Sequence, residues 1–160
     1  MMLRHTLAAV LFVLPAAAFA QVAPTPARYV DAIDWPASEQ GMDRFFEAEV
    51  RLNAGFDKIC GDTFCEGEYG NLRPMQLRCS VDSTKGTMKQ CLWLFSGSTA
   101  AVNPKSGAVQ TAAKLFKCKL LLAKDTPVDK FYEVMNGDDA LHAKLPMSRY
   151  SVYDGLVGCL

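Results

Sequence analysis

The stretch MQLRCSVDSTKGTMKQCLWLFS, residues 75–96, decides the fold that we expect for this chain. Apolar and polar residues alternate from Met75 to Asp82, and the later run from Leu92 to Phe95 is apolar and aromatic. Both patterns favour β-strands. Between the runs lies Ser-Thr-Lys-Gly, which is typical of a turn. The stretch therefore predicts a β-hairpin with strands at 75–82 and 87–96.

This hairpin would place two cysteines opposite each other. Cys79 and Cys91 are equally far from Lys85 along the chain, so a hairpin centred on Lys85 sets them on the same face. Directly opposed Cβ atoms in an antiparallel pair are about 4.5–5.5 Å apart. A disulfide needs slightly less than this distance, so a small adjustment would close the bond.

The remaining elements are placed by periodicity and by capping residues. Apolar residues recur at helical spacing over 41–59, and 114–123 alternates like a third strand. Thr126 is expected to be an N-cap with Pro127 at the first helical position, and Asn136-Gly137 would end that helix. A last helix is expected over 148–159. The fold class is therefore α+β: an N-terminal amphipathic helix, a three-stranded antiparallel β-meander and two C-terminal helices, stapled by disulfides.

The chain contains six cysteines, which allow fifteen pairings. We expect Cys60–Cys65 as a local bridge, Cys79–Cys91 across the hairpin, and Cys118–Cys159 between the third strand and the last helix. The first pair has C-x4-C spacing, unlike the C-x-x-C of redox sites, and paired zinc-ligand spacings are missing. No metal and no cofactor are expected.

The amino terminus has the pattern of a secretory signal peptide. Arg4 precedes an apolar run, and small residues at Ala18 and Ala20 suit cleavage before Gln21. The apolar run is too short for a bilayer-spanning anchor, so no stable membrane anchor is expected after cleavage. We expect residues 1–20 as signal peptide, 21–40 as an extended N-terminal arm and 41–160 as one domain, in a periplasmic or secreted protein.

Charge is balanced overall but divided along the chain. There are 17 basic and 17 acidic residues, which gives no reason to expect a nucleic-acid partner. Residues 31–68 contain ten acidic and three basic residues, whereas 73–130 contain ten basic and three acidic residues. These segments would make the protein a dipole if they form different faces.

Catalytic signals are sparse. After cleavage His142 is the single histidine, no G-x-S-x-G motif is present, and every cysteine has an expected partner. We therefore expect no catalytic residues and no enzymatic activity. A hydrolase that uses two carboxylates from the acidic segment is the alternative.

The acidic segment from Asp57 to Asn71 is the first candidate binding site, because a short loop closed by a disulfide presents side chains at low entropic cost. Calcium binding is a second possibility for this segment, because its carboxylates are oxygen ligands, although their spacing does not match the calcium-loop motif. The polar loop 96–109 is a second candidate. The candidate binding residues of the acidic loop are Asp62, Phe64, Glu66, Glu68 and Tyr69.

In general layout the chain resembles the small exported α+β proteins with disulfides that Gram-negative bacteria keep in the periplasm, several of which neutralise enzymes that attack the envelope. The resemblance is one of class and size. It favours a binding protein with a protein partner, of the inhibitor or immunity type. An envelope hydrolase and a calcium-binding structural protein are the alternatives, and the oligomeric state stays open.

Overall fold

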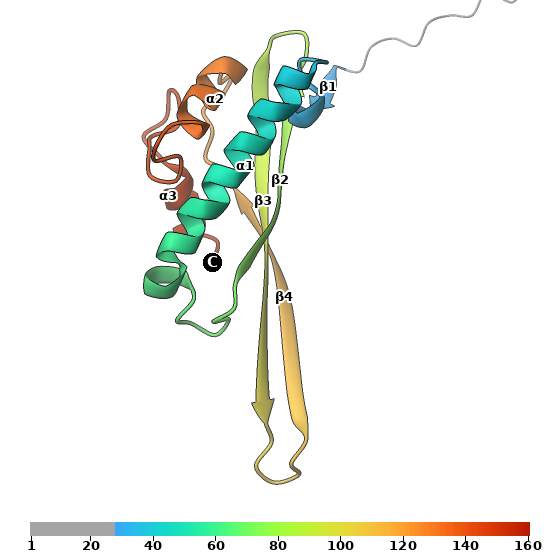
Figure 1. The fold of residues 1–160 in the computed structure, drawn as a ribbon, viewed down its shortest axis with the longest axis vertical. Helices are drawn as coiled ribbons and strands as arrows, with labels where there is room; N and C mark the ends of the chain where they lie inside the picture. Colours follow the sequence, from blue (N-terminus) through green and yellow to red (C-terminus); the bar gives the residue numbers. More distant parts are fainter. Residues whose placement is uncertain (1–27) are drawn as a thin grey trace, which may run out of the picture.

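The computed structural model describes residues 28–160. The expected signal peptide, and the part of the N-terminal arm before Arg28, lie outside the described residues. A four-stranded antiparallel sheet in the order β1-β2-β3-β4 is packed against one long helix, which lies between β1 and β2 in the chain, and two short helices, which follow β4 (Figure 1). The elements are β1 (Tyr29–Asp31), η1 (Ala32–Asp34, 3-10), α1 (Glu39–Ile59), η2 (Cys60–Phe64, a π-helical turn), β2 (Arg73–Asp82), β3 (Thr87–Val102), β4 (Val109–Lys119), α2 (Val128–Met135) and α3 (Val152–Val157).

Helix α1 confirms the expected amphipathic helix. Ser38 has an extended backbone, and its side chain accepts a hydrogen bond from the Gly41 amide at 3.3 Å, which satisfies one of the unpaired groups at the helix start. Phe45, Leu52 and Phe56 fall on one face of the helix and are fully buried. This face lies over the sheet.

The hairpin and its disulfide confirm the register that the sequence predicts. Cys79 pairs directly with Cys91, and their Cα atoms are 4.1 Å apart. The Cys91 carbonyl accepts from the Leu120 amide on the β4 side, so the two cysteines form a non-hydrogen-bonded pair, in which side chains approach most closely. The other bridges are Cys60–Cys65 and Cys118–Cys159, as expected from the sequence.

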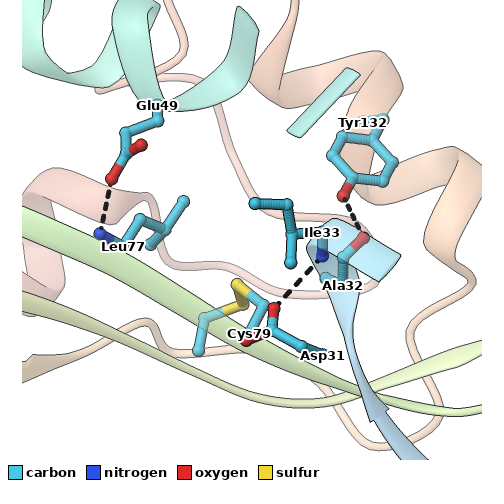
Figure 2. The surroundings of a disulfide bond; sticks show 8 residues. Asp31, Ala32, Ile33, Glu49, Leu77, Cys79 and Tyr132 are labelled. Carbon is cyan, nitrogen blue, oxygen red and sulfur yellow. Dashed lines mark hydrogen bonds between the residues drawn. A yellow bond between two sulfur atoms is a disulfide. The ribbon is translucent and has the colours of Figure 1, made fainter. Parts of the chain in front are cut away.

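The expected number of strands is wrong, because residues 29–31 add a strand. β1 pairs with the end of β2 through Tyr29–Asp82, Val30–Val81 and Asp31–Ser80. The chain then turns into η1, where Asp31 accepts a hydrogen bond from the Ile33 amide (Figure 2). Three residues are too few for an alternation signal, so this strand depends on the free edge of β2.

The third strand and the loop before it are also corrected. The strand runs over Val109–Lys119 rather than 114–123, and β3 continues to Val102, so the expected loop 96–109 shrinks to 103–108. Phe116, Cys118 and Leu120 are buried, as expected for the inner side. Most of the extra strand residues are exposed on both faces, so they show no apolar-polar alternation.

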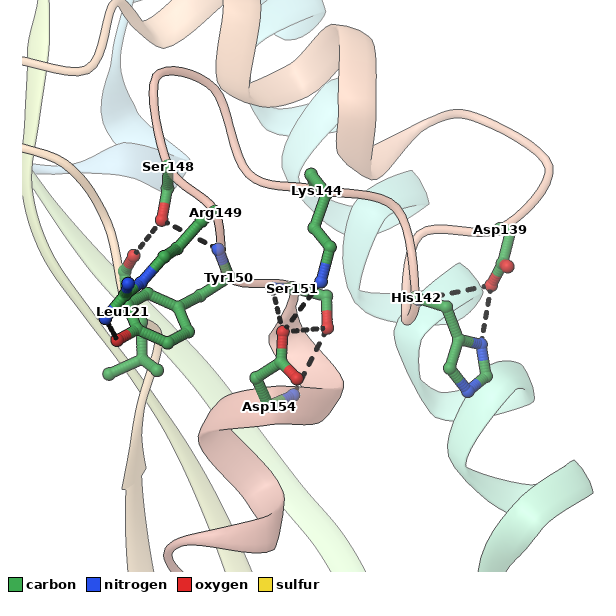
Figure 3. Close-up of polar contacts among 9 residues, drawn as sticks. All are labelled: Leu121, Asp139, His142, Lys144, Ser148, Arg149, Tyr150, Ser151 and Asp154. Atoms are coloured by element: carbon green, nitrogen blue, oxygen red, sulfur yellow. Dashed lines mark hydrogen bonds and ion pairs between the residues drawn. The ribbon is translucent and has the colours of Figure 1, made fainter.

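The two C-terminal helices start later than predicted. Pro127, not Thr126, is the N-cap of α2, because Pro127 keeps an extended ψ of 137°, and the buried Thr126 hydroxyl donates to the Ala123 carbonyl at 2.8 Å. Helix α3 covers Val152–Val157 rather than 148–159. Its start is a capping box in which Ser151 and Asp154 bond each other's amides (Figure 3).

The core lies between the inner face of the sheet and the helices. Trp93 and Phe95 of β3 are fully buried, with ring centroids 4.6 Å apart, and Phe56 of α1 lies 6.0 and 4.8 Å from them. Helices α2 and α3 add Phe131 and Leu156 to the same cluster. The sheet has one face in this core, so its other face is solvated.

Two features bear on location. Among the helices of residues 28–160, none combines the length and the apolar character needed to cross a bilayer. The three disulfides are compatible with an extracellular protein.

The disulfides should differ in what they contribute to stability. Cys118 and Cys159 are 41 residues apart, whereas Cys60 and Cys65 are five apart. In the chain-entropy model, these loops correspond to about 4 and about 2 kcal/mol. We expect Cys159→Ser to lower the free energy of unfolding, measured in urea, by about 2–5 kcal/mol, and Cys65→Ser to lower it by less. Equal losses would contradict this assignment.

Acid should weaken the start of α3. Asp154 accepts from the Ser151 amide at 2.7 Å and from the Lys144 ammonium at 3.1 Å, and these bonds, with the Ser151 hydroxyl, lower the pKa of Asp154 from 3.8 to about 2. The ionised carboxylate therefore contributes stability above pH 3.8, which is lost as the pH falls through 2. We expect urea midpoints of Asp154→Asn to change less between these pH values than those of the native protein. The exposed Asp138→Asn is the control and should keep the native dependence.

Candidate functional site

The acidic loop follows α1 directly. The π-helical turn η2 carries the chain from Cys60 to Phe64, and the Cys65 amide donates to the Cys60 carbonyl at 2.6 Å, beside the disulfide between the same residues. Asp62, Glu66 and Glu68, three of the candidate binding residues, are exposed.

The two aromatic residues of the loop point inward. The Phe64 ring stacks on Phe56 at 6.0 Å and contacts Tyr153 at 5.8 Å, and the Tyr69 ring meets Phe116 edge-on at 5.7 Å. Both side chains are partly buried against the core. They therefore anchor the loop, and the exposed surface that the loop offers to a partner is its carboxylates.

The end of the acidic loop also packs against β3. A Cβ atom added to Gly97 would lie 2.8 Å from the Cβ of Tyr69 and 2.9 Å from Leu72, so the loop packs directly on the glycine backbone. One residue further, the Asn71 side chain accepts from the Ser98 amide at 2.7 Å and donates to the Ser98 hydroxyl at 2.8 Å. The Asn71 side chain thus bonds β3 just beyond the start of β2, where a further β2 residue would pair.

The acidic loop does not form a carboxylate pair in a pocket. A cavity of about 110 Å³ beside it contains one carboxylate, Glu68, among its lining residues. Within residues 28–160, no three side chains of the His, Cys, Asp and Glu types are grouped so that they could hold a metal ion.

His142 lies elsewhere, beside α1. Its Nδ1 is 2.9 Å from Asp139 Oδ1 (Figure 3). Its ring lies 5.0 Å from that of Tyr153. The hydrogen bond with His142 is the main cause that lowers the pKa of Asp139. The described groove next to His142 contains no serine, threonine or cysteine in its lining, so this His–Asp pair has no nucleophile to activate there.

The most prominent surface element is a β-hairpin that leaves the body of the protein. We call residues 98–113 the projecting hairpin: the last part of β3, the turn 103–108 and the first part of β4. In Figure 1 it extends well beyond the helices. Residues 104–115 are all exposed, among them Val109 at 67% of its surface. Apart from Lys105, the projecting hairpin carries no charged residue, and most of its residues are small or polar.

The edges of the sheet are treated differently in the body and in the projecting hairpin. In the body, Glu49 of α1 accepts a hydrogen bond at 2.8 Å from the Leu77 amide on the free edge of β2 (Figure 2). At the other edge, a Cβ on Gly155 would lie 2.8 Å from the Lys119 carbonyl oxygen, so α3 covers the end of β4. Covered edges resist pairing with other chains.

The projecting hairpin has two open edges. Because the Ser98 amide points to Asn71, away from β4, Ser98 and its partner Ala113 form a non-hydrogen-bonded pair. By strand alternation, the amide and carbonyl of Thr111 and Ala113 also point away from β3. On the opposite edge, the amide and carbonyl of Ala100 point away from β4. Within the described chain, no third strand pairs with these groups.

The tip of the projecting hairpin is ordered by one side chain. Asn103 Oδ1 accepts from the Lys105 amide at 2.9 Å and the Ser106 amide at 3.2 Å, and its backbone bonds Gly107 and Ala108 at 2.8 Å each. Gly107 has φ of +69°, which glycine adopts without strain. The sequence analysis expected a loop over 96–109 and missed the strand extensions on either side of this turn, although Asn103 and Gly107 between Val102 and Val109 are a recognisable turn signal.

The divided charge becomes a difference between faces. Trp93 and its neighbours Leu77 and Cys118 face the helices, so the next cross-strand row, Arg78–Leu92–Lys119, faces solvent on the other side. Basic residues are therefore displayed on the open face of the sheet. The acidic residues of 31–68 belong mainly to α1 and the loop after it.

Comparisons with protein-family models, with curated proteins and with solved structures find no match for this chain.

Gly97 should be required for the close packing of the loop on β3. Because an alanine Cβ would overlap Tyr69 and Leu72, we expect Gly97→Ala to lower the free energy of unfolding by about 1–3 kcal/mol in urea titrations. Gly67→Ala is the control, since a Cβ there meets no atom within 4 Å. Similar stability of the two variants would show that the loop does not pack as described.

Proposed function

We propose that this protein is an exported, disulfide-stabilised binding protein of the inhibitor or immunity type, which acts on an envelope-targeting enzyme through the projecting hairpin. The observation behind this proposal is that residues 98–113 leave the body with two open strand edges and an ordered tip. Signal-peptide cleavage and a periplasmic location belong to the proposal.

Contacts with the rest of the protein contribute little to the stability of the projecting hairpin. An isolated two-stranded hairpin is at best marginally stable in water, and exposed edges invite unwanted pairing. A long exposed hairpin is therefore costly unless it has a partner. An extended segment of the partner could pair with the outward groups of β4, and small side chains such as Ala112 and Ala113 would allow close approach.

Disulfides tie both strands of the hairpin to the body of the protein. Cys91 lies in β3 and forms a disulfide with Cys79 of β2. Cys118 lies in β4 and forms a disulfide with Cys159, which follows α3. Both cysteines are buried. A hairpin whose base is fixed loses less conformational freedom on binding, which favours affinity.

The alternatives have less support. A carboxylate hydrolase needs two acids converging on a cavity, and the cavity beside the acidic loop is lined by Glu68 alone among acids. A calcium site needs several oxygen ligands, and the described residues contain no such group of acids. The exposed carboxylates Asp62, Glu66 and Glu68 remain candidates for a secondary contact with the partner.

The experiment compares the native oxidised protein and three variants of it as bait against envelope and secretion extracts. Thr111→Pro removes an outward amide from the β4 edge but no β3–β4 hydrogen bond, so the hairpin is expected to persist. Thr111→Ala is its matched control and keeps the edge. The third variant replaces Asp62, Glu66 and Glu68 with alanine. The captured enzyme is then purified, and its affinity for each form and its inhibition are measured.

The proposal predicts that one enzyme binds the native and Thr111→Ala forms, is inhibited by them, and binds Thr111→Pro at least about tenfold more weakly, roughly the loss of one or two hydrogen bonds. Loss of binding with the acidic-loop variant alone would place the contact on that loop instead. A native dimer that Thr111→Pro converts to a monomer, measured by light scattering, would identify a second copy as the occupant and contradict the inhibitor proposal.

A further inference from the structure

A separate groove lies at the end of the sheet opposite the projecting hairpin. It is lined by the start of β3, the end of β4, the following segment 120–125 and the residues around β1, and its volume is about 340 Å³. This size falls within the range of small-ligand sites. Because the groove shares no residue with the projecting hairpin, an inference about it is independent of the proposed function.

The lining of the groove is strongly basic. Five cationic side chains contribute to it, against two carboxylates, Asp82 and Asp125. The cations are Arg28, Lys85, Lys89, Lys119 and Lys124. Like charges brought together repel one another, so this cluster costs stability unless a counter-charge is present.

The carboxylates of the groove are already occupied. Asp82 has a side chain only 6% exposed, and its Oδ2 accepts from Arg28 Nε at 3.1 Å and Nη2 at 2.9 Å. Its Oδ1 accepts from the Thr84 hydroxyl at 2.6 Å and the Thr84 amide at 3.2 Å. Hydrogen bonds from Thr84 and Arg28 lower the pKa of Asp82 to about 2, so it stays ionised and balances Arg28. Asp125 is paired with Lys85 at 3.3 Å.

Three ammonium groups are left over. Within residues 28–160, Lys89, Lys119 and Lys124 make no ion pair with an acid within 4.0 Å. They come from different segments: Lys89 from β3, Lys119 from the end of β4 and Lys124 from the segment beyond it. The fold therefore brings three unpaired positive charges to one groove.

We propose that this groove binds a phosphate or diphosphate group, with Lys89, Lys119 and Lys124 as its counter-charges. Lysine ammonium groups bind phosphate as point charges with rotatable donors. Several lysines match a multiply charged anion better than one carboxylate, which would neutralise only one of them. The group could belong to a soluble phosphorylated compound or to a lipid headgroup.

The test uses pyrophosphate and the full oxidised protein in isothermal titration calorimetry. We expect one saturable site, and we expect Lys89→Gln, Lys119→Gln and Lys124→Gln each to weaken binding by about fivefold, the upper end for an exposed ion pair. Lys105→Gln at the tip of the projecting hairpin removes the same charge far from the groove and should bind like the native protein. Absence of saturable binding would overturn the proposal. An equal loss with Lys105→Gln would do so too, because it would indicate a general charge effect.

Vesicle sedimentation separates the two sources of the phosphate group. Vesicles that contain phosphatidic acid are compared with vesicles of phosphatidylcholine alone. If the protein sediments with the phosphatidic acid vesicles and pyrophosphate reverses this, the ligand is a lipid headgroup. If the protein binds pyrophosphate but does not sediment with these vesicles, the ligand is a soluble compound. Sedimentation that pyrophosphate does not reverse would contradict the groove as the site.

Discussion

The packing of one long strand, β3, against α1 is the interaction on which the rest of the structure depends. Trp93 and Phe95 are buried against Phe56, and this contact fixes which face of β3 points inward. Since β3 lies between β2 and β4, its orientation also fixes the inner faces of both neighbours. The same strand continues beyond the core as one side of the projecting hairpin, so the core determines how that hairpin is presented.

The molecule protects its strand edges near the core and leaves them open in the projecting hairpin. The β2 edge is covered by β1 and by Glu49, and the end of β4 is covered by the backbone of α3 at Gly155. Asn71 is the last residue that covers the β3 edge, at Ser98, and the edge of β3 is open beyond Ser98. Because proteins usually block exposed edges, this change along one strand supports a binding role for the hairpin.

Much of the body could be predicted from the sequence. The alternation in 75–82, the periodicity of 41–59 and the cysteine spacing around Lys85 are local signals, and the structure has the corresponding strand, helix and disulfide. β1 and the ends of β3 and β4 were missed because they depend on pairing partners distant in sequence or on positions exposed on both faces. In the acidic loop, the inward packing of Phe64 and Tyr69 depends on Tyr153 and Phe116, which are distant in sequence, so no local pattern shows it. The lysine groove combines residues from separate segments, which no local pattern shows.

The central claim is that the projecting hairpin is formed in the free protein and keeps its outer edges unpaired. Amide hydrogen exchange of the oxidised protein tests this claim most directly. The account predicts alternation: amides of Thr99 and Ala112, which face the partner strand, should be protected, whereas those of Ala100, Thr111 and Ala113 should exchange rapidly. Rapid exchange at every position would mean that the hairpin does not form alone, and protection at every position would mean that its edges are already covered. Either result would contradict the account.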